Sequence, residues 1–89
     1  MKVYISGDRR GKNAFMNAVF QLREKGFEPV NPLTFLQGGS VGTRTVFHIV
    51  SLLECDAIYL LPSWEKSFMS RMEYQIAFRT GKEILSGNE

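Results

Sequence analysis

A glutamate within an apolar helix face is the residue of this sequence that most suggests chemistry. Residues 67 to 80 carry apolar side chains three and four apart, and Glu73 falls inside that stripe, about 40° from its centre at roughly 100° per residue. Burying an unpaired charge is costly, so a carboxylate there needs a partner or has a chemical role. Two interpretations remain open: Glu73 pairs with an arginine, or it acts on a ligand from a partly dry pocket.

The turn that follows the first apolar run is a candidate anion site. Gly7 and Gly11 let backbone N–H groups approach an anion, and a positive helix N-terminus follows them. Arg9, Arg10 and Lys12 add positive charge. The pattern is neither a P-loop nor the dinucleotide-binding fingerprint, so a plain basic surface turn stays the alternative.

Ser67 and His48 carry weaker signals. Ser67 stands where a serine either caps the helix of Glu73 or contacts a phosphate. His48 is the single histidine and is placed beside Phe47, off the apolar stripe of its helix, where a lone histidine is more often structural or exposed. No group of Cys, His or carboxylates has metal-ligand spacing, so we expect neither a metal nor a cofactor.

Strands and helices alternate along the chain to position these residues. Strands are expected at residues 2–6, 27–32, 57–61 and 83–85. Helices are expected at residues 13–25, 43–54 and 67–80, with a loop at 33–42. Such alternation predicts an α/β fold, a small flavodoxin-like three-layer sandwich with a four-stranded parallel sheet. Open sheets of this kind bind ligands at the carboxyl ends of their strands.

The helix at 43–54 is expected to bury one apolar face. The spacing assigns to that face Val46, Ile49, Val50 and Leu53.

Length and charge limit the classes of function. Eighty-nine residues, 44% hydrophobic and 22% charged, predict one domain over 1–89. A net charge of +2 suits an anionic small molecule but is too weak for a surface that binds polymeric nucleic acid. Cys55 is the single cysteine, which suits a reducing cytoplasm. No apolar run is long enough for a membrane span, and the apolar start is too short for a signal peptide.

Three segments together resemble a known family. VYISGDRRG at the start, LLECDAIYLLPSWEKS in the middle and the Glu73 helix are similar to the nucleoside 2-deoxyribosyltransferase superfamily, above all its small phage and bacterial members of unknown function. The similarity spans nearly the whole chain. It implies a flavodoxin-like fold, a homodimer, and cleavage or transfer at the N-glycosidic bond of deoxynucleosides or their 5′-monophosphates.

The resemblance also assigns roles to residues. The glutamate that matches Glu73 attacks the anomeric carbon of the deoxyribose, and the tyrosine that matches Tyr4 lies near it. A carboxylate suits this chemistry because the glycosidic bond breaks through an oxocarbenium-like state. The implied 5′-phosphate site consists of Gly7, Asp8, Arg10, Gly11 and Ser67.

Two departures from the family pattern keep a second function open. Met69 replaces a glycine two residues after the serine, and His48 replaces an aspartate that assists catalysis in the nucleotide hydrolases. One hypothesis is therefore an N-glycosidase or deoxyribosyltransferase with Glu73 as nucleophile and His48 near the site. The other is a non-catalytic module that binds a nucleotide or a protein. Glu73 paired with an arginine and Met69 filling the cleft would favour the module.

The apolar residues also predict an assembly. Phe47, Phe68, Met69, Tyr74 and Phe78 offer more apolar surface than one side of a four-stranded sheet can cover. A two-fold dimer in which the Glu73 helices meet would bury that excess. The alternative is that Tyr74 and Phe78 pack under the 33–42 loop.

Overall fold

One parallel sheet organises the chain. The structure, a computed structural model, describes residues 1–34 and 41–87. Within them the sheet has the strand order β2-β1-β3-β4, with all neighbouring pairs parallel. The strands are β1 Lys2–Ser6, β2 Glu28–Val30, β3 Ala57–Leu60 and β4 Glu83–Ser86. The helices are α1 Lys12–Glu24, α2 Val41–Leu53 and α3 Phe68–Arg79, with 3₁₀ turns η1 Pro32–Thr34 and η2 Trp64–Lys66.

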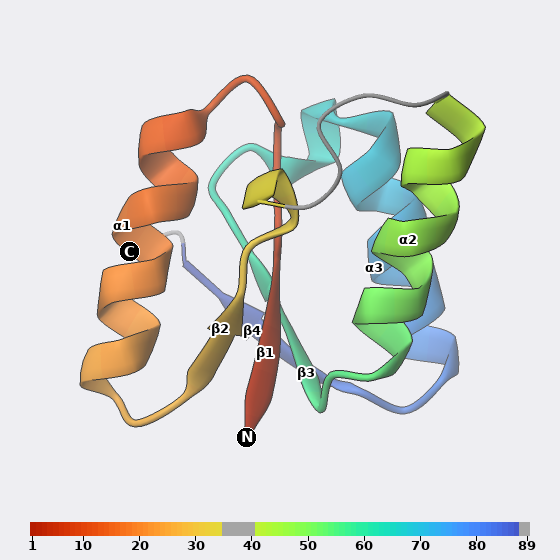
Figure 1. Ribbon diagram of the computed structural model, residues 1–89. Coiled ribbons are helices and arrows are strands. Elements are labelled where there is room, and N and C mark those ends of the chain that lie inside the picture. Colours follow the sequence, from red (N-terminus) through yellow and green to blue (C-terminus); the bar gives the residue numbers. More distant parts are fainter. Residues whose placement is uncertain (35–40, 88–89) are drawn as a thin grey trace.

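Helices cover both faces of this sheet. Figure 1 shows α1 on one side and α2 with α3 on the other. The predicted α/β class and the flavodoxin-like sandwich with four parallel strands are therefore confirmed. The proline-containing strand β2 lies at the edge of the sheet, as expected.

Alternation along β1 sends its side chains to two separate cores. Val3 and Ile5 pack with α1 residues such as Phe15 on one face. Tyr4 packs with Leu52 of α2 on the opposite face. The face covered by α2 and α3 is the one on which Tyr4 and Glu73 meet, as described below.

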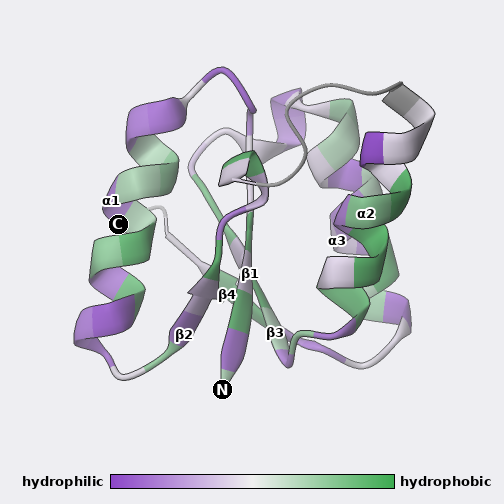
Figure 2. Ribbon diagram, viewed as in Figure 1, coloured by the Kyte–Doolittle hydropathy of each residue, from purple (hydrophilic) through white to green (hydrophobic). Residues whose placement is uncertain are grey.

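The predicted buried face of α2 is wrong. Val46, Val50 and Leu53 are 59%, 47% and 47% exposed, whereas the neighbouring Leu52 has no exposed surface. The helix is rotated so that Leu52 enters the core and His48 is half-buried. Apolar residues dominate the C-terminal half of α2 (Figure 2) and fall on more than one side of it, so periodicity alone does not fix which side faces the sheet.

Capping residues are found at both ends of α3. Ser67 is the N-cap of α3, where its hydroxyl accepts a hydrogen bond from the Ser70 N–H at 3.2 Å. Gly81 follows the helix with φ 76°, a left-handed conformation that glycine adopts readily. Among the described residues, no helix combines the length and apolarity needed to cross a bilayer.

Leu52→Ala and Leu53→Ala together test the orientation of α2. Leu52→Ala empties a fully buried site, so it should lower the free energy of unfolding by about 2–5 kcal/mol. Leu53→Ala removes the same atoms from a half-exposed side chain and should cost less than about 1 kcal/mol. Urea unfolding of dilute protein measures both losses. Equal losses, or a larger loss for Leu53→Ala, would show that the helix faces the sheet the other way.

Candidate active site

Glu73 is fully buried between α3 and the sheet. It belongs to the inner face of α3 together with Ser70 and Ala77, and its exposed fraction is zero. The prediction that Glu73 lies within the buried stripe is therefore confirmed. The partly dry pocket expected around Glu73 is not observed, because no surface of the Glu73 side chain reaches solvent.

Three side chains donate hydrogen bonds to the Glu73 carboxylate. Tyr4 Oη donates to Oε2 at 2.7 Å, and Ser6 Oγ donates to Oε1 at 2.7 Å. Both come from β1, where a spacing of two residues puts them on the same face. Arg9 Nη2 donates to Oε2 at 2.6 Å and completes an ion pair. The carboxylate thus has donors on both oxygens and a compensating charge, the conditions under which a buried carboxylate is tolerated.

A fourth side chain extends this network. Ser70 Oγ lies 2.9 Å from Ser6 Oγ, and both hydroxyls are fully buried. The single hydroxyl proton of Ser6 goes to Glu73, so Ser70 serves as the donor between the two serines. Ser6 and Ser70 were missed from the sequence, although strand and helix spacing place them beside Tyr4 and Glu73.

The surroundings of Tyr4 hold its hydroxyl protonated. Burial, and next the negative charge of Glu73, raise the pKa of Tyr4 well above its ordinary value. The phenol is therefore a permanent donor to the carboxylate at neutral pH. Its hydroxyl lies 2.7 Å from the candidate nucleophile, and the role that the resemblance implied for Tyr4 stays a prediction.

Arg9 is a further residue of this network whose contact with Glu73 the sequence did not indicate. Its guanidinium also donates from Nη1 to the Gly7 carbonyl at 3.0 Å and from Nη2 to Tyr4 Oη at 3.3 Å. It lies over the Phe15 ring, 5.8 Å from the centroid. No spacing rule distinguishes Arg9 from its neighbour Arg10, because the path of the turn decides which of the two points inward.

The other residues of the turn point elsewhere. Arg10 is largely exposed and binds Asp8 at 2.7 and 3.0 Å, and its hydrogen bonds hold the pKa of Asp8 at about 2. The N–H of Gly11 donates to the Asp8 carbonyl at 2.9 Å. A Cβ on Gly7 would lie 2.7 Å from Leu61 Cδ1, so packing alone explains that glycine. Among the described residues, Glu73 accepts no hydrogen bond from Gly7, Asp8, Arg10 or Gly11.

A small cavity lies against the outer side of Arg9. It measures about 160 Å³, and its lining within the described residues is Arg9, Arg44, Thr45, His48 and Met69. Burial, and next the charge of Arg9, lower the pKa of His48, so its imidazole is neutral at pH 7. The rotation of α2 thus brings His48 towards the site, contrary to its predicted place off the buried stripe. Met69 lines the cavity beside it.

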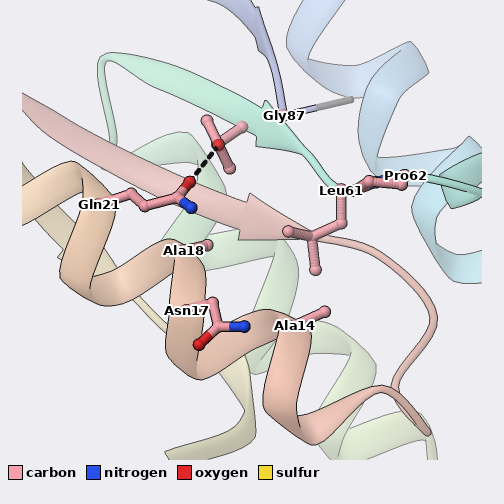
Figure 3. Close-up of a pocket in the computed structure, with 8 residues that line it drawn as sticks. Ala14, Asn17, Ala18, Gln21, Leu61, Pro62 and Gly87 are labelled. Carbon is pink, nitrogen blue, oxygen red and sulfur yellow. Dashed lines mark hydrogen bonds between the residues drawn. The ribbon is translucent and has the colours of Figure 1, made fainter. Parts of the chain in front are cut away.

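A separate cavity of about 180 Å³ lies on the α1 side of the sheet (Figure 3). It is crossed by a hydrogen bond from Tyr59 to Gln21 of 3.2 Å. None of the candidate site residues lines it. As for metals, no group of three His, Cys, Asp or Glu among residues 1–34 and 41–87 could hold an ion.

Comparisons with known proteins agree with this fold. The sequence model of a domain of unknown function (DUF4406) matches residues 1–86. The structure resembles a 2-deoxyribosyltransferase from Leishmania mexicana, with a TM-score of 0.76, 22% identity, and coverage of 96% of this chain and 62% of that chain. It also resembles the CMP N-glycosidase BcmB from Clostridium botulinum, with a TM-score of 0.74, 24% identity, and coverage of 97% and 67%. A search of curated proteins found no match.

These likenesses establish the fold. The nucleoside 2-deoxyribosyltransferase-like fold that the sequence suggested is confirmed. The chain spans about three fifths of the length of the Leishmania protein.

Tyr4→Phe tests the buried phenol through the pH dependence of stability. The folded state holds the Tyr4 proton far above the ordinary pKa of 10, whereas the unfolded chain releases it near pH 10. The stability due to this proton is therefore complete below pH 10 and is lost as the pH rises further. Between pH 10 and 11.5 the wild type should lose about 1–2 kcal/mol more than Tyr4→Phe. Parallel curves in urea unfolding would mean that Tyr4 ionises freely in the folded protein.

Proposed function

The chain belongs to the family described as a domain of unknown function (DUF4406), and we propose that it cleaves or transfers at the N-glycosidic bond of a deoxynucleotide or deoxynucleoside. Glu73 is the nucleophile. The observation that carries this proposal is the orientation of its carboxylate by Tyr4 and Ser6 at the carboxyl end of β1. Ligands of open parallel sheets bind at that end. Two proteins of similar fold, a 2-deoxyribosyltransferase and a CMP N-glycosidase, support the class of reaction.

The reaction has two steps. A Glu73 oxygen forms a bond to the anomeric carbon while the bond from that carbon to the base nitrogen breaks, and the base leaves with the electron pair and takes a proton from solvent. A water molecule, or the nitrogen of a second base, then attacks the same carbon and releases Glu73. Tyr4 and Ser6 fix the plane of the carboxylate during both steps. His48, neutral at pH 7, is a hydrogen-bonding group beside the substrate.

The substrate's 5′-phosphate is assigned to the turn after β1. Gly7, Asp8, Arg10 and Gly11 belong to that turn, and Ser67 begins α3. Arg9 belongs to the same turn and lines the cavity of about 160 Å³, so a phosphate bound at this turn would also meet Arg9. We further propose a small-molecule partner rather than a polymeric nucleic acid or a membrane, a single domain over 1–89, and a cytoplasmic location.

A second function is favoured by one specific observation. Arg9 neutralises Glu73, and Met69 stands at the cavity beside it where the resembled enzymes carry glycine. A permanent ion pair would leave Glu73 with a structural role only. The protein would then be a nucleotide- or protein-binding module without turnover.

Glu73→Gln separates the two functions. The amide keeps the shape of the side chain but is a poor nucleophile, so release of base from deoxynucleotides should fall by about a thousand-fold or more. Glu65→Gln makes the same change at an exposed position and should leave release unchanged. Chromatography of a panel of deoxynucleoside monophosphates measures the free base, and circular dichroism verifies the fold. Absence of base release by the wild type would support the binding module.

The apolar surface of α2 and α3 supports a homodimer. The most exposed aromatic side chains on these helices are Phe47, Phe68 and Phe78, at 50%, 70% and 63%. Tyr74 packs against Trp64 in a tilted arrangement and stacks with Phe78, with ring centroids 5.0 and 6.1 Å away, and so joins Phe78 to the body of the protein. A symmetric contact buries such a patch on both subunits at once. The alternative cover from the 33–42 loop depends on residues 35–40, which lie outside the described residues.

Phe78→Glu tests the dimer. A charge in the centre of a symmetric apolar contact faces its own copy, so the variant should sediment as a monomer at micromolar concentration while the wild type sediments as a dimer. Phe20→Glu is the matched control, since Phe20 is 57% exposed on α1, across the sheet. It should leave the dimer intact. A monomeric wild type would refute the assembly.

A further inference from the structure

Arg9 stands between Glu73 and the cavity of about 160 Å³. On its inner side it donates to Glu73 Oε2, and on its outer side it lines the cavity. Its side chain keeps 22% of its surface exposed, whereas that of Glu73 keeps none. The described lining of the cavity therefore includes Arg9 but not Glu73.

The chemistry of the cavity suits an anion. Two of its described lining residues, Arg9 and Arg44, are positively charged, and none is acidic. Its volume is several times the roughly 30 Å³ that one water molecule occupies in the liquid, so a phosphate-sized group has room. An arginine presents its donors in a planar fork that matches the oxygens of a phosphate.

Within the described part of the chain, the hydrogen bonds of Arg9 use three of its five N–H donors and leave two, on Nε and Nη1, for such a ligand. Nη1 donates to Gly7, and Nη2 donates to Tyr4 and Glu73. Nε is buried and has no hydrogen-bond acceptor among the described residues. A buried donor without an acceptor is unfavourable, so a phosphate oxygen beside Nε would satisfy the guanidinium better than Glu73 alone does.

We propose that the ion pair with Arg9 blocks Glu73 reversibly and determines substrate specificity. An anionic phosphate group in the Arg9–Arg44–His48 cavity draws the guanidinium away from the carboxylate. This inference rests on the proposed function and adds to it a preference for phosphorylated substrates. Without phosphate the nucleophile stays neutralised. With phosphate, Oε2 keeps the hydrogen bond from Tyr4 but loses the one from Arg9, which frees a lone pair for the anomeric carbon. Arg9 acts here through Glu73 and is a positioning residue.

The first test measures competition for Arg9 and needs no turnover. Inorganic phosphate is added to the wild type and to Glu73→Gln while the Nε–H signal of Arg9 is followed by ¹H–¹⁵N NMR. The signal should shift in both proteins. The phosphate concentration at which the shift saturates should be at least about ten-fold lower in Glu73→Gln. The reason is that a hydrogen bond to a charged carboxylate, which phosphate must replace in the wild type, is worth at least such a factor in affinity. Equal affinity in the two proteins, or no shift of the Arg9 signal, overturns the proposal.

The second test compares substrates in Arg9→Met and in Arg23→Met, which removes the same charge from the exposed end of α1. Each variant is assayed with a deoxynucleoside 5′-monophosphate and with its nucleoside. In Arg9→Met the kcat for the nucleoside should rise, and the preference for the nucleotide should fall about ten-fold or more. Arg23→Met should keep the wild-type preference. An equal loss for both substrates in Arg9→Met overturns the proposal.

The two tests separate this inference from the proposed function. A wild type that cleaves neither substrate refutes the proposed function, and the phosphate competition still decides the role of Arg9. The NMR titration also stands if Arg9→Met does not fold, since it uses only the wild type and Glu73→Gln.

Discussion

A carboxylate with no exposed surface must be compensated inside the protein, and this constraint determines the arrangement around Glu73. Each surrounding element contributes to the compensation. Strand β1 supplies the hydroxyls of Tyr4 and Ser6, and the turn after it supplies the charge of Arg9. Helix α3 adds Ser70, which supports Ser6. Removing a single partner from such a cluster is more destabilising than replacing the whole cluster by apolar groups, because a buried charge is left behind.

The same compensation opposes catalysis. A nucleophile needs a free lone pair and a path for its substrate, whereas Glu73 has three donors and no contact with solvent. Two of those donors, Tyr4 and Ser6, lie on a central strand and are fixed by it. Arg9 belongs to a turn and is partly exposed, so it is the donor that can move at least cost. In the proposed account, whether Arg9 can leave Glu73 is therefore one physical difference between an enzyme and a binding module on this fold.

Much of the fold and part of the site follow from sequence patterns. Alternating strands and helices predict the sheet, helical spacing places Glu73 on the buried face, and Ser67 is recognisable as a helix cap. Two features do not follow. Helix α2 carries apolar residues on more than one side, so its periodicity does not separate the face that meets the sheet from the face left exposed, and the inward position of His48 was missed with it. Arg9 and Arg10 are adjacent and chemically identical, and only the path of the backbone decides which one reaches Glu73.

The most direct measurement is mass spectrometry of the protein after incubation with deoxynucleotide analogues that carry fluorine at the 2′ position. Fluorine destabilises the oxocarbenium-like state and slows the release of a glycosyl group from its carboxylate, so a covalent intermediate accumulates. With Glu73 as nucleophile, the protein gains the mass of one fluorinated deoxyribose phosphate, and peptide fragmentation places it on Glu73. An unmodified protein after base has been released, or an adduct on another residue, would contradict the central role of Glu73.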